Sequence, residues 1–98
     1  MVVYDDMDLP MGSLRIRASG GTGGHKGIAS ISERLASKNF ARMRIGIGRP
    51  EVGETTAWVL GKFSNDEKEQ IQIVVKNAAD ALDKWVKKGI IEAMNAYN

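Results

Sequence analysis

The chain has 98 residues, which is enough for one domain with a modest hydrophobic core. Hydrophobic residues make up 43% and charged residues 27%, a balance typical of a folded globular domain. The absence of cysteine excludes a disulfide scaffold, a thiolate zinc site and a cysteine nucleophile, and the single histidine excludes a multi-histidine metal site. We expect no metal site of these kinds, and we expect no cofactor.

Two further patterns bear on location. No apolar run approaches the roughly 20 residues that a membrane-spanning helix needs. The first residues carry acidic side chains where a signal peptide has basic and then apolar ones. These patterns predict a cytoplasmic protein with no membrane partner.

The net charge of +2 conceals an uneven distribution along the chain. Residues 1–10 carry three aspartates and no basic residue, whereas residues 11–50 carry eight lysines and arginines against one glutamate. Residues 51–98 are slightly acidic, with eight acids and six bases. A basic stretch of this kind attracts polyanions such as nucleic acids, although the solvated face of an unrelated domain shows the same pattern.

The first half of the chain predicts three short strands. Residues 2–4 are apolar and indicate the end of a buried strand that stops at Asp5. Residues 13–18 and 40–47 alternate between apolar and polar side chains, as in half-buried strands. The outward positions of these two strands are basic: Arg15, Arg17, Arg42 and Arg44. Arginines paired at this spacing suit successive phosphates of a nucleic acid, and plain solvent-facing positions are the alternative interpretation.

Residues 19–27 form a glycine-rich segment that leads into a helix predicted from His25 to Ala36. Closely spaced glycines before a helix can present backbone N–H groups to a phosphate. The two common nucleotide motifs nevertheless fail, because Gly27 follows Lys26 where a P-loop needs serine or threonine, and Lys26 stands where a dinucleotide motif needs glycine. The segment therefore disfavours an ordinary nucleotide site.

His25 and Asp5 are the candidate chemical groups. A lone histidine is more often structural, but glycine neighbours leave this ring accessible to a ligand. Asp5 ends a predicted strand, where α/β folds bind ligands. Turn capping is the alternative for Asp5, Asp6 and Asp8, and we favour it for Asp8. A set of Ser19, His25 and Asp5 imitates a hydrolase triad, which we disfavour because serines are common.

The second half predicts a short apolar segment at 56–63 and then a long amphipathic helix. Ser64 and Glu67 have the spacing of a capping box, and Gly89 is a typical helix stop. The apolar positions that we expect to face the core are Ile71, Val74, Val75, Ala78, Ala79, Leu82 and Val86. Residues 90–97 can form one more short helix. Strands mixed with helices and no linker indicate a single α/β domain.

Taken in order, five segments resemble the bacterial peptidyl-tRNA hydrolase family: residues 3–10, 14–17, 23–31, 42–50 and 59–63. The resemblance implies an α/β fold around a small mixed sheet, with the glycine-rich loop leading into a helix and a long C-terminal helix. It also implies a metal-free cytoplasmic enzyme that hydrolyses the ester between a peptide and the 3′ ribose of tRNA. Residues 1–98 then form the C-terminal portion of such a domain.

The resemblance assigns roles to individual residues. Asp5 matches the aspartate that orients the family's catalytic histidine, and His25 matches the histidine that positions substrate and water. Gly24 and Lys26 fall in the substrate-binding loop, where lysine replaces an asparagine and can donate but not accept a hydrogen bond. The residues at phosphate-binding positions for tRNA are Arg15, Arg17 and Arg44.

The resemblance does not extend to the family's N-terminal half, which carries the catalytic histidine. We therefore expect the chain to be weakly active or inactive by itself, and to self-associate or bind a separately supplied N-terminal half. The alternatives are a non-catalytic RNA-binding relative and a truncated fragment. Hydrolysis with the other half present, binding without hydrolysis, or neither would separate these three hypotheses.

Overall fold

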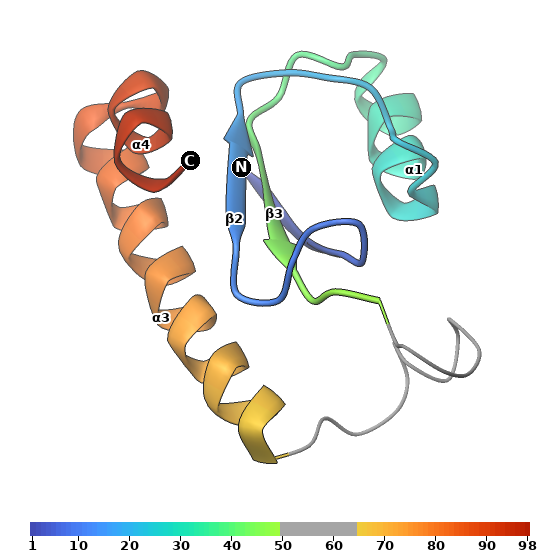
Figure 1. Ribbon diagram of the computed structural model, residues 1–98. Helices are drawn as coiled ribbons and strands as arrows, with labels where there is room; N and C mark the ends of the chain where they lie inside the picture. Colours follow the sequence, from blue (N-terminus) through green and yellow to red (C-terminus); the bar gives the residue numbers. More distant parts are fainter. Residues whose placement is uncertain (50–64) are drawn as a thin grey trace.

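The computed structural model describes residues 1–49 and 65–98 of the chain. Its elements in chain order are β1 (Val2–Asp6), β2 (Leu14–Arg17), α1 (Lys26–Leu35), β3 (Arg42–Gly46), α3 (Asn65–Lys88) and α4 (Ile90–Tyr97). The strands form one sheet in the order β1–β3–β2, with β1 parallel and β2 antiparallel to β3. Helices α3 and α4 lie on one side of the sheet and α1 on the other (Figure 1). The predicted α/β fold with a small mixed sheet is confirmed.

The hydrophobic core lies between the sheet and the two C-terminal helices. Strand register places Ile16 beside Met43, and both side chains are fully buried. The core residues are Leu14, Ile16, Met43, Val74, Ala78, Ala81 and Ala93. The alternation predicted for residues 13–18 is confirmed, because the apolar side chains of β2 are buried and its two arginines are exposed.

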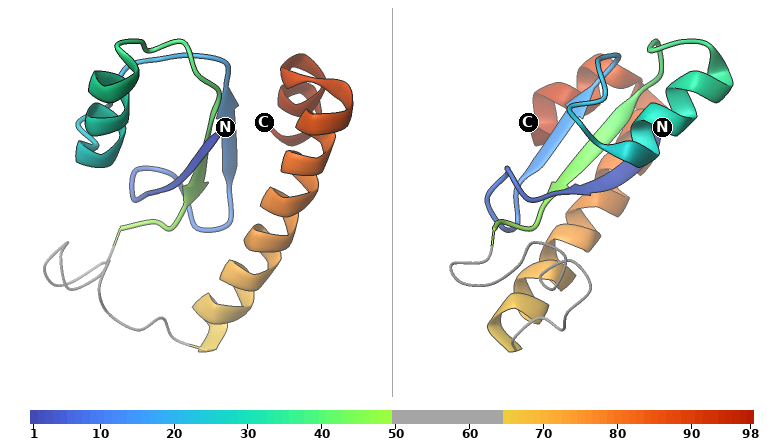
Figure 2. Two further views of the ribbon diagram at one scale, coloured as in Figure 1. Left: turned by 180° about the vertical axis from the view of Figure 1, so that it is seen from behind. Right: turned by 90° about the vertical axis from the view of Figure 1, so that its right-hand side faces the viewer.

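The opposite face of the sheet carries the arginines. The register aligns Arg15 of β2 with Arg44 of β3, and Arg17 with Arg42. Helix α1 stands over one end of this face (Figure 2), and Ile28 is its one buried residue. Much of the arginine-bearing face is therefore left open beside α1.

Two sequence expectations about packing are wrong. Strand β1 is not buried, and Val3 is 39% exposed: β1 is one of the two outer strands of the sheet, and α4 packs against the other, β2. The predicted core stripe of α3 is too wide, since Val75 and Val86 are 53% and 75% exposed. A three-stranded sheet with α4 beside it covers only a narrow stripe of a long helix, and Ala81 occupies that stripe instead.

The C-terminal elements close the other edge of the sheet. Gly89 separates α3 from α4 with a φ of 92°, as expected of a helix stop. The side-chain amide of Asn98 accepts a hydrogen bond from the Ile16 N–H at 2.6 Å and donates one to the Ile16 carbonyl at 3.0 Å. This pair of bonds caps the free edge of β2.

The apolar segment predicted at 56–63 and the capping serine, Ser64, lie outside the described residues. Within residues 1–49 and 65–98, no helix has the length and apolar character needed to cross a bilayer.

Candidate functional site

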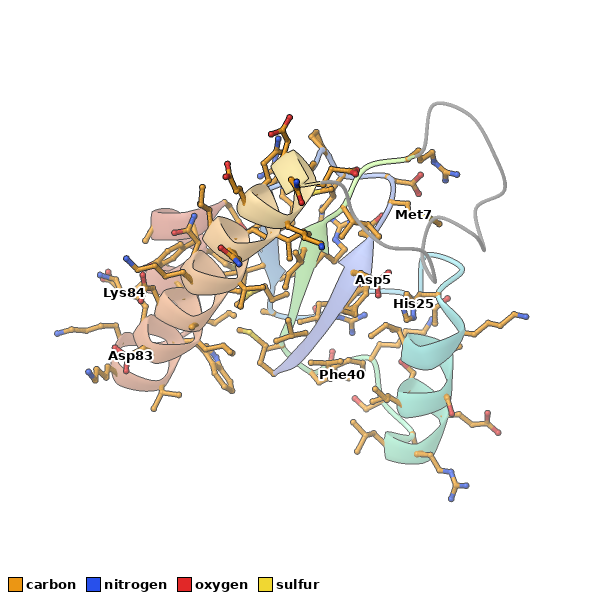
Figure 3. The ribbon with its side chains drawn as sticks, turned by 90° about the horizontal axis from the view of Figure 1, so that it is seen from below. Asp5, Met7, His25, Phe40, Asp83 and Lys84 are labelled. Carbon is orange, nitrogen blue, oxygen red and sulfur yellow. The ribbon has the colours of Figure 1, made fainter. Side chains whose placement is uncertain are left out.

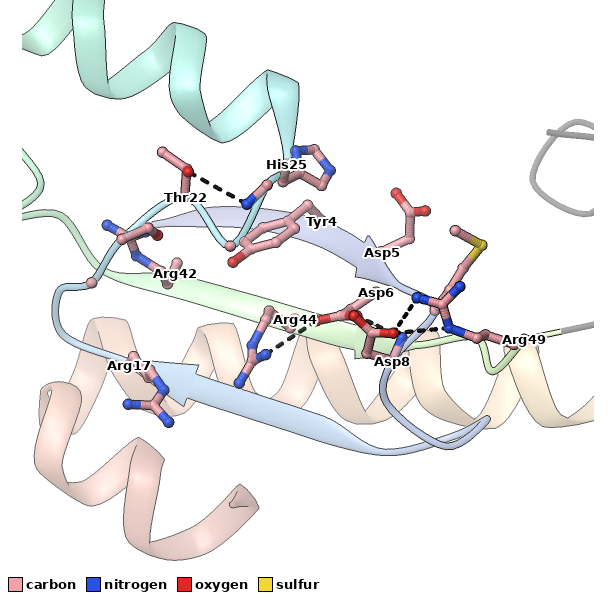
Figure 4. A pocket seen from close by; sticks show the side chains of 15 residues that line it. Tyr4, Asp5, Asp6, Asp8, Arg17, Thr22, His25, Arg42, Arg44 and Arg49 are labelled. Carbon is pink, nitrogen blue, oxygen red and sulfur yellow. Dashed lines mark hydrogen bonds and ion pairs between the residues drawn. The ribbon is translucent and has the colours of Figure 1, made fainter. Parts of the chain in front are cut away.

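A pocket of about 580 Å³ lies between the arginine-bearing face of the sheet and the glycine-rich loop (Figure 4). It brings together the end of β1, the loop before α1 and three arginines that Figure 4 labels along β2 and β3. The lining residues are Tyr4, Asp5, Asp6, Met7, Asp8, Arg17, Gly20, Gly21, Thr22, Gly23, Gly24, His25, Arg42, Arg44 and Arg49. The pocket therefore contains both candidate chemical groups, Asp5 and His25.

A tight turn in the glycine-rich loop positions His25. The His25 N–H donates to the Thr22 carbonyl at 2.9 Å, and the two residues between them, Gly23 and Gly24, have φ values of 58° and 79°. Side chains are strained at positive φ, so the turn favours glycine at both positions. The turn delivers His25 to the N-cap position of α1 in an extended conformation.

The His25 ring is held by two contacts. Its Nδ1 atom accepts a hydrogen bond from the Ile28 N–H at 3.2 Å, which satisfies one of the free donors at the start of α1. It also packs against the ring of Tyr4 in a T-shaped arrangement, with centroids 4.8 Å apart. Because Nδ1 acts as an acceptor, a neutral ring carries its proton on Nε2. His25 is therefore suited to donate a hydrogen bond from Nε2.

The three aspartates near the end of β1 have different environments. Asp6 accepts a hydrogen bond from the Asp8 N–H at 2.7 Å and an ion pair from Arg44 at 3.1 Å, and Asp8 pairs with Arg49. The Asp5 carboxylate forms no hydrogen bond or ion pair with any residue of 1–49 or 65–98, and it is exposed. The turn is thus capped by Asp6, not by Asp8 as expected, and the exposed Asp5 carboxylate remains accessible at the pocket.

Asp5 and His25 lie near each other at one end of the sheet (Figure 3). No hydrogen bond joins them, and the one bond that the His25 ring forms within the described residues is the one from the Ile28 N–H to Nδ1. A triad of Asp5, His25 and Ser19 therefore receives no support from the geometry: Ser19 does not line the pocket.

The arginines divide into three groups by exposure. Arg15 and Arg17 are exposed, and Arg17 also lines the pocket. Arg44 is partly covered and is already paired with Asp6. Arg42 is 3% exposed, so the expectation of an outward phosphate-binding side chain there is wrong. The residues that follow β2 fold back over β3 and cover the Arg42 side chain. This contact joins segments that are distant in the sequence, so the alternation along β3 does not predict it.

The substrate-binding candidates also differ in position. Gly24 lines the pocket, whereas Lys26 is exposed on the first turn of α1 and is not among the lining residues. The sequence patterns did not identify Tyr4, which lines the pocket and packs against His25. Its position in the strand next to Asp5 could have indicated that it lies at the site. Within the described part of the chain, no group of three or more acidic, histidine or cysteine side chains is arranged to hold a metal ion.

The family model for peptidyl-tRNA hydrolase matches residues 1–98. The peptidyl-tRNA hydrolase of Syntrophomonas wolfei is 61% identical over 98 residues, and that of Geobacillus kaustophilus is 46% identical over 99 residues. Each match covers the whole of this chain and 53% of the relative. The crystal structure of peptidyl-tRNA hydrolase from Acinetobacter baumannii superimposes with a TM-score of 0.82 at 33% identity, covering 98% of this chain and 50% of that one. The chain thus spans about half the length of the relatives it matches.

Proposed function

The chain belongs to the peptidyl-tRNA hydrolase family, and from that premise we propose that it binds peptidyl-tRNA and contributes to hydrolysis of the ester between the peptide and the 3′ ribose. The observation that carries the proposal is one pocket that holds a carboxylate with no partner among the described residues, Asp5, and a fixed imidazole, His25, beside an arginine-bearing sheet face. The basic face would receive the tRNA backbone, and the pocket would receive the ester.

The arrangement of the arginines on the sheet supports the binding of tRNA phosphates. Arg15 and Arg17 point from the same face of β2 into solvent, and Arg44 lies beside Arg15 on β3. Two exposed guanidinium groups can each form two hydrogen bonds with a phosphate. Arg44 would have to exchange its ion pair with Asp6 for a phosphate, so we assign it a smaller share of the binding energy.

His25 would act as a hydrogen-bond donor. With Nδ1 committed to the helix cap, Nε2–H is free to donate to the acyl oxygen as negative charge develops on it. Accepting a proton from water at Nε2 would require the other tautomer and would break the bond to Ile28. A separate base is therefore needed to activate water.

The family resemblance places that base on a histidine outside these 98 residues, and Asp5 would orient it. This assignment fits the environment of Asp5, which is at the pocket and has no partner among the described residues. A carboxylate hydrogen-bonded to the base fixes its tautomer and stabilises its charged form. We therefore propose that Asp5 acts through the base and that His25 contacts the substrate.

The test joins the part of the Syntrophomonas wolfei relative that this chain does not cover to the front of this chain. We expect the 98-residue chain alone to bind tRNA without appreciable hydrolysis, and the joined protein to hydrolyse peptidyl-tRNA. In the joined protein, His25→Asn should lower kcat by about 10²-fold, because asparagine retains the helix cap but lacks the Nε2–H donor. Arg34→Ala, on the exposed side of α1, is the control and should leave kcat unchanged.

The alternative is a non-catalytic RNA-binding relative, which is favoured by the commitment of the chain's single imidazole to a helix cap. Binding of tRNA by a folded joined protein that hydrolyses nothing would support this alternative. Absence of both binding and hydrolysis would contradict both functions.

A salt titration tests the binding face independently of hydrolysis. Arg15→Ala and Arg17→Ala should each weaken tRNA binding and reduce the slope of log K against log salt concentration by about one, because each removes one phosphate contact. Filter binding of tRNA between low and moderate salt measures the slope. Arg34→Ala should leave it unchanged, and an unchanged slope in the Arg17 variant would remove that residue from the interface.

A further inference from the structure

Arg42 is a buried cation whose partners are neutral. Its guanidinium donates to the carbonyl oxygens of Gly21 at 2.7 Å, Lys38 at 2.9 Å and Phe40 at 3.4 Å. It also lies over the Phe40 ring, 4.1 Å from the centroid. Within residues 1–49 and 65–98, no carboxylate pairs with it. A buried charge persists only where such contacts satisfy it, so the site is built around an arginine.

The three carbonyls come from both sides of α1. Gly21 belongs to the glycine-rich loop before the helix, and Lys38 and Phe40 belong to the segment after it. The two segments also meet directly, because the Gly20 N–H donates to the Lys38 carbonyl at 3.3 Å. Arg42 therefore connects β3, at the centre of the sheet, to both ends of the loop–helix–loop unit.

This connection matters because α1 has few other anchors. Ile28 is its one buried residue, Leu35 at its far end is 58% exposed, and Figure 1 shows the helix standing away from the sheet. From the Gly21 carbonyl, the backbone continues into the turn in which the Thr22 carbonyl holds the His25 N–H. The position of His25 thus depends on a chain of bonds that begins at Arg42.

We propose that Arg42 is a positioning residue, which fixes the glycine-rich loop on the sheet and thereby sets the place and tautomer of the His25 ring. The inference deepens the proposed function and rests on it for its catalytic meaning. The fork of an arginine reaches three carbonyls in different directions and stacks on an aromatic ring, which the single ammonium of a lysine does not do. Arg42→Lys should therefore not hold the His25 ring in its native position.

Because His25 is the one histidine in the chain, its ring gives an unambiguous NMR signal. In the unmodified 98-residue chain, we expect the ring nitrogens to report the Nε2–H tautomer and the Ile28 amide to be protected. In Arg42→Met, whose side chain replaces the aliphatic part of arginine but not the guanidinium, the ring should report a mixture of tautomers, and the Ile28 amide should exchange about tenfold faster. Arg34→Met removes an exposed arginine in the last turn of α1 and should change neither signal.

The outcomes separate the positioning role from folding and from the proposed function. The amide signals of Ile16 and Met43 report the core, and they should be unchanged in Arg42→Met if only the loop moves. A folded variant whose ring signals match those of the unmodified chain would overturn the proposal. If Arg42→Met unfolds the whole chain, Arg42→Lys decides: it keeps the charge but cannot reach the three carbonyls, and an unchanged His25 tautomer in that variant would overturn the proposal. Neither readout requires hydrolysis, so a folded joined protein that hydrolyses no peptidyl-tRNA would contradict the proposed function and leave this inference standing.

Discussion

Replacing Asp5 with asparagine is expected to lower kcat of the joined protein by about 10²–10⁴-fold and to leave tRNA binding unchanged. The amide can still accept a hydrogen bond from a base, but it carries no charge to stabilise the protonated form. Single-turnover hydrolysis of peptidyl-tRNA at saturating enzyme measures this step apart from binding. An undiminished rate would show that Asp5 does not act in the chemistry.

The stability of the same variant gives an internal check. Asp5 forms no hydrogen bond or ion pair among the described residues, so Asp5→Asn should leave the melting temperature unchanged. Asp6→Asn is the matched control, because the same chemical change one residue further along β1 weakens both the turn bond to Asp8 and the pair with Arg44. That variant should lose stability and retain most of kcat. Adjacent carboxylates would thus separate by role, one in chemistry and one in structure.

The parts of the site that could be predicted depend on local geometry. The alternation in residues 13–18 predicts which side of β2 faces the core, because successive side chains of a strand point to opposite faces. The start of α1 at Lys26, with His25 as its cap, lies within one residue of the expected boundary. Gly89 marks the break between the last two helices, as its sequence context indicates. Each of these features is determined by residues close together in the chain.

The parts that could not be predicted depend on contacts between distant segments. Arg42 has the same alternating context as Arg44, yet the Gly21 carbonyl, 21 residues earlier in the chain, receives its guanidinium. Val75 is exposed because a three-stranded sheet covers only part of the apolar face of α3. The periodicity of the helix does not predict how wide that covered part is. The bonds between Asn98 and Ile16 likewise join positions 82 residues apart. Sequence patterns indicate which side chains share a face, but not which element covers that face.

Gly46→Ala is expected to lower the free energy of unfolding by about 3 kcal/mol, the upper part of the range for overpacking a filled site. A Cβ at this position would overlap the backbone carbonyl of Pro10 and the hydroxyl of Ser13, and it would lie 3.0 Å from the Leu9 Cβ. The backbone oxygen cannot rotate away as a flexible side chain does. Urea denaturation followed by circular dichroism measures the loss. Gly21→Ala is the control, because nothing lies within 4 Å of its Cβ position, and it should be nearly neutral.

The same substitution should disturb the pocket as well as the fold. The Gly46 N–H donates to the Ser13 carbonyl at 2.8 Å, and the Gly46 carbonyl accepts from the Gly12 N–H at 3.0 Å. These two hydrogen bonds hold the turn after β1 against β3. Gly46 also pairs with Asp6, the neighbour of Asp5, in the strand register. Moving the turn away from an added methyl group would therefore shift the end of β1. We expect the joined protein carrying Gly46→Ala to lose kcat even at temperatures where it stays folded, and an unchanged kcat in the folded variant would show that the turn does not position Asp5.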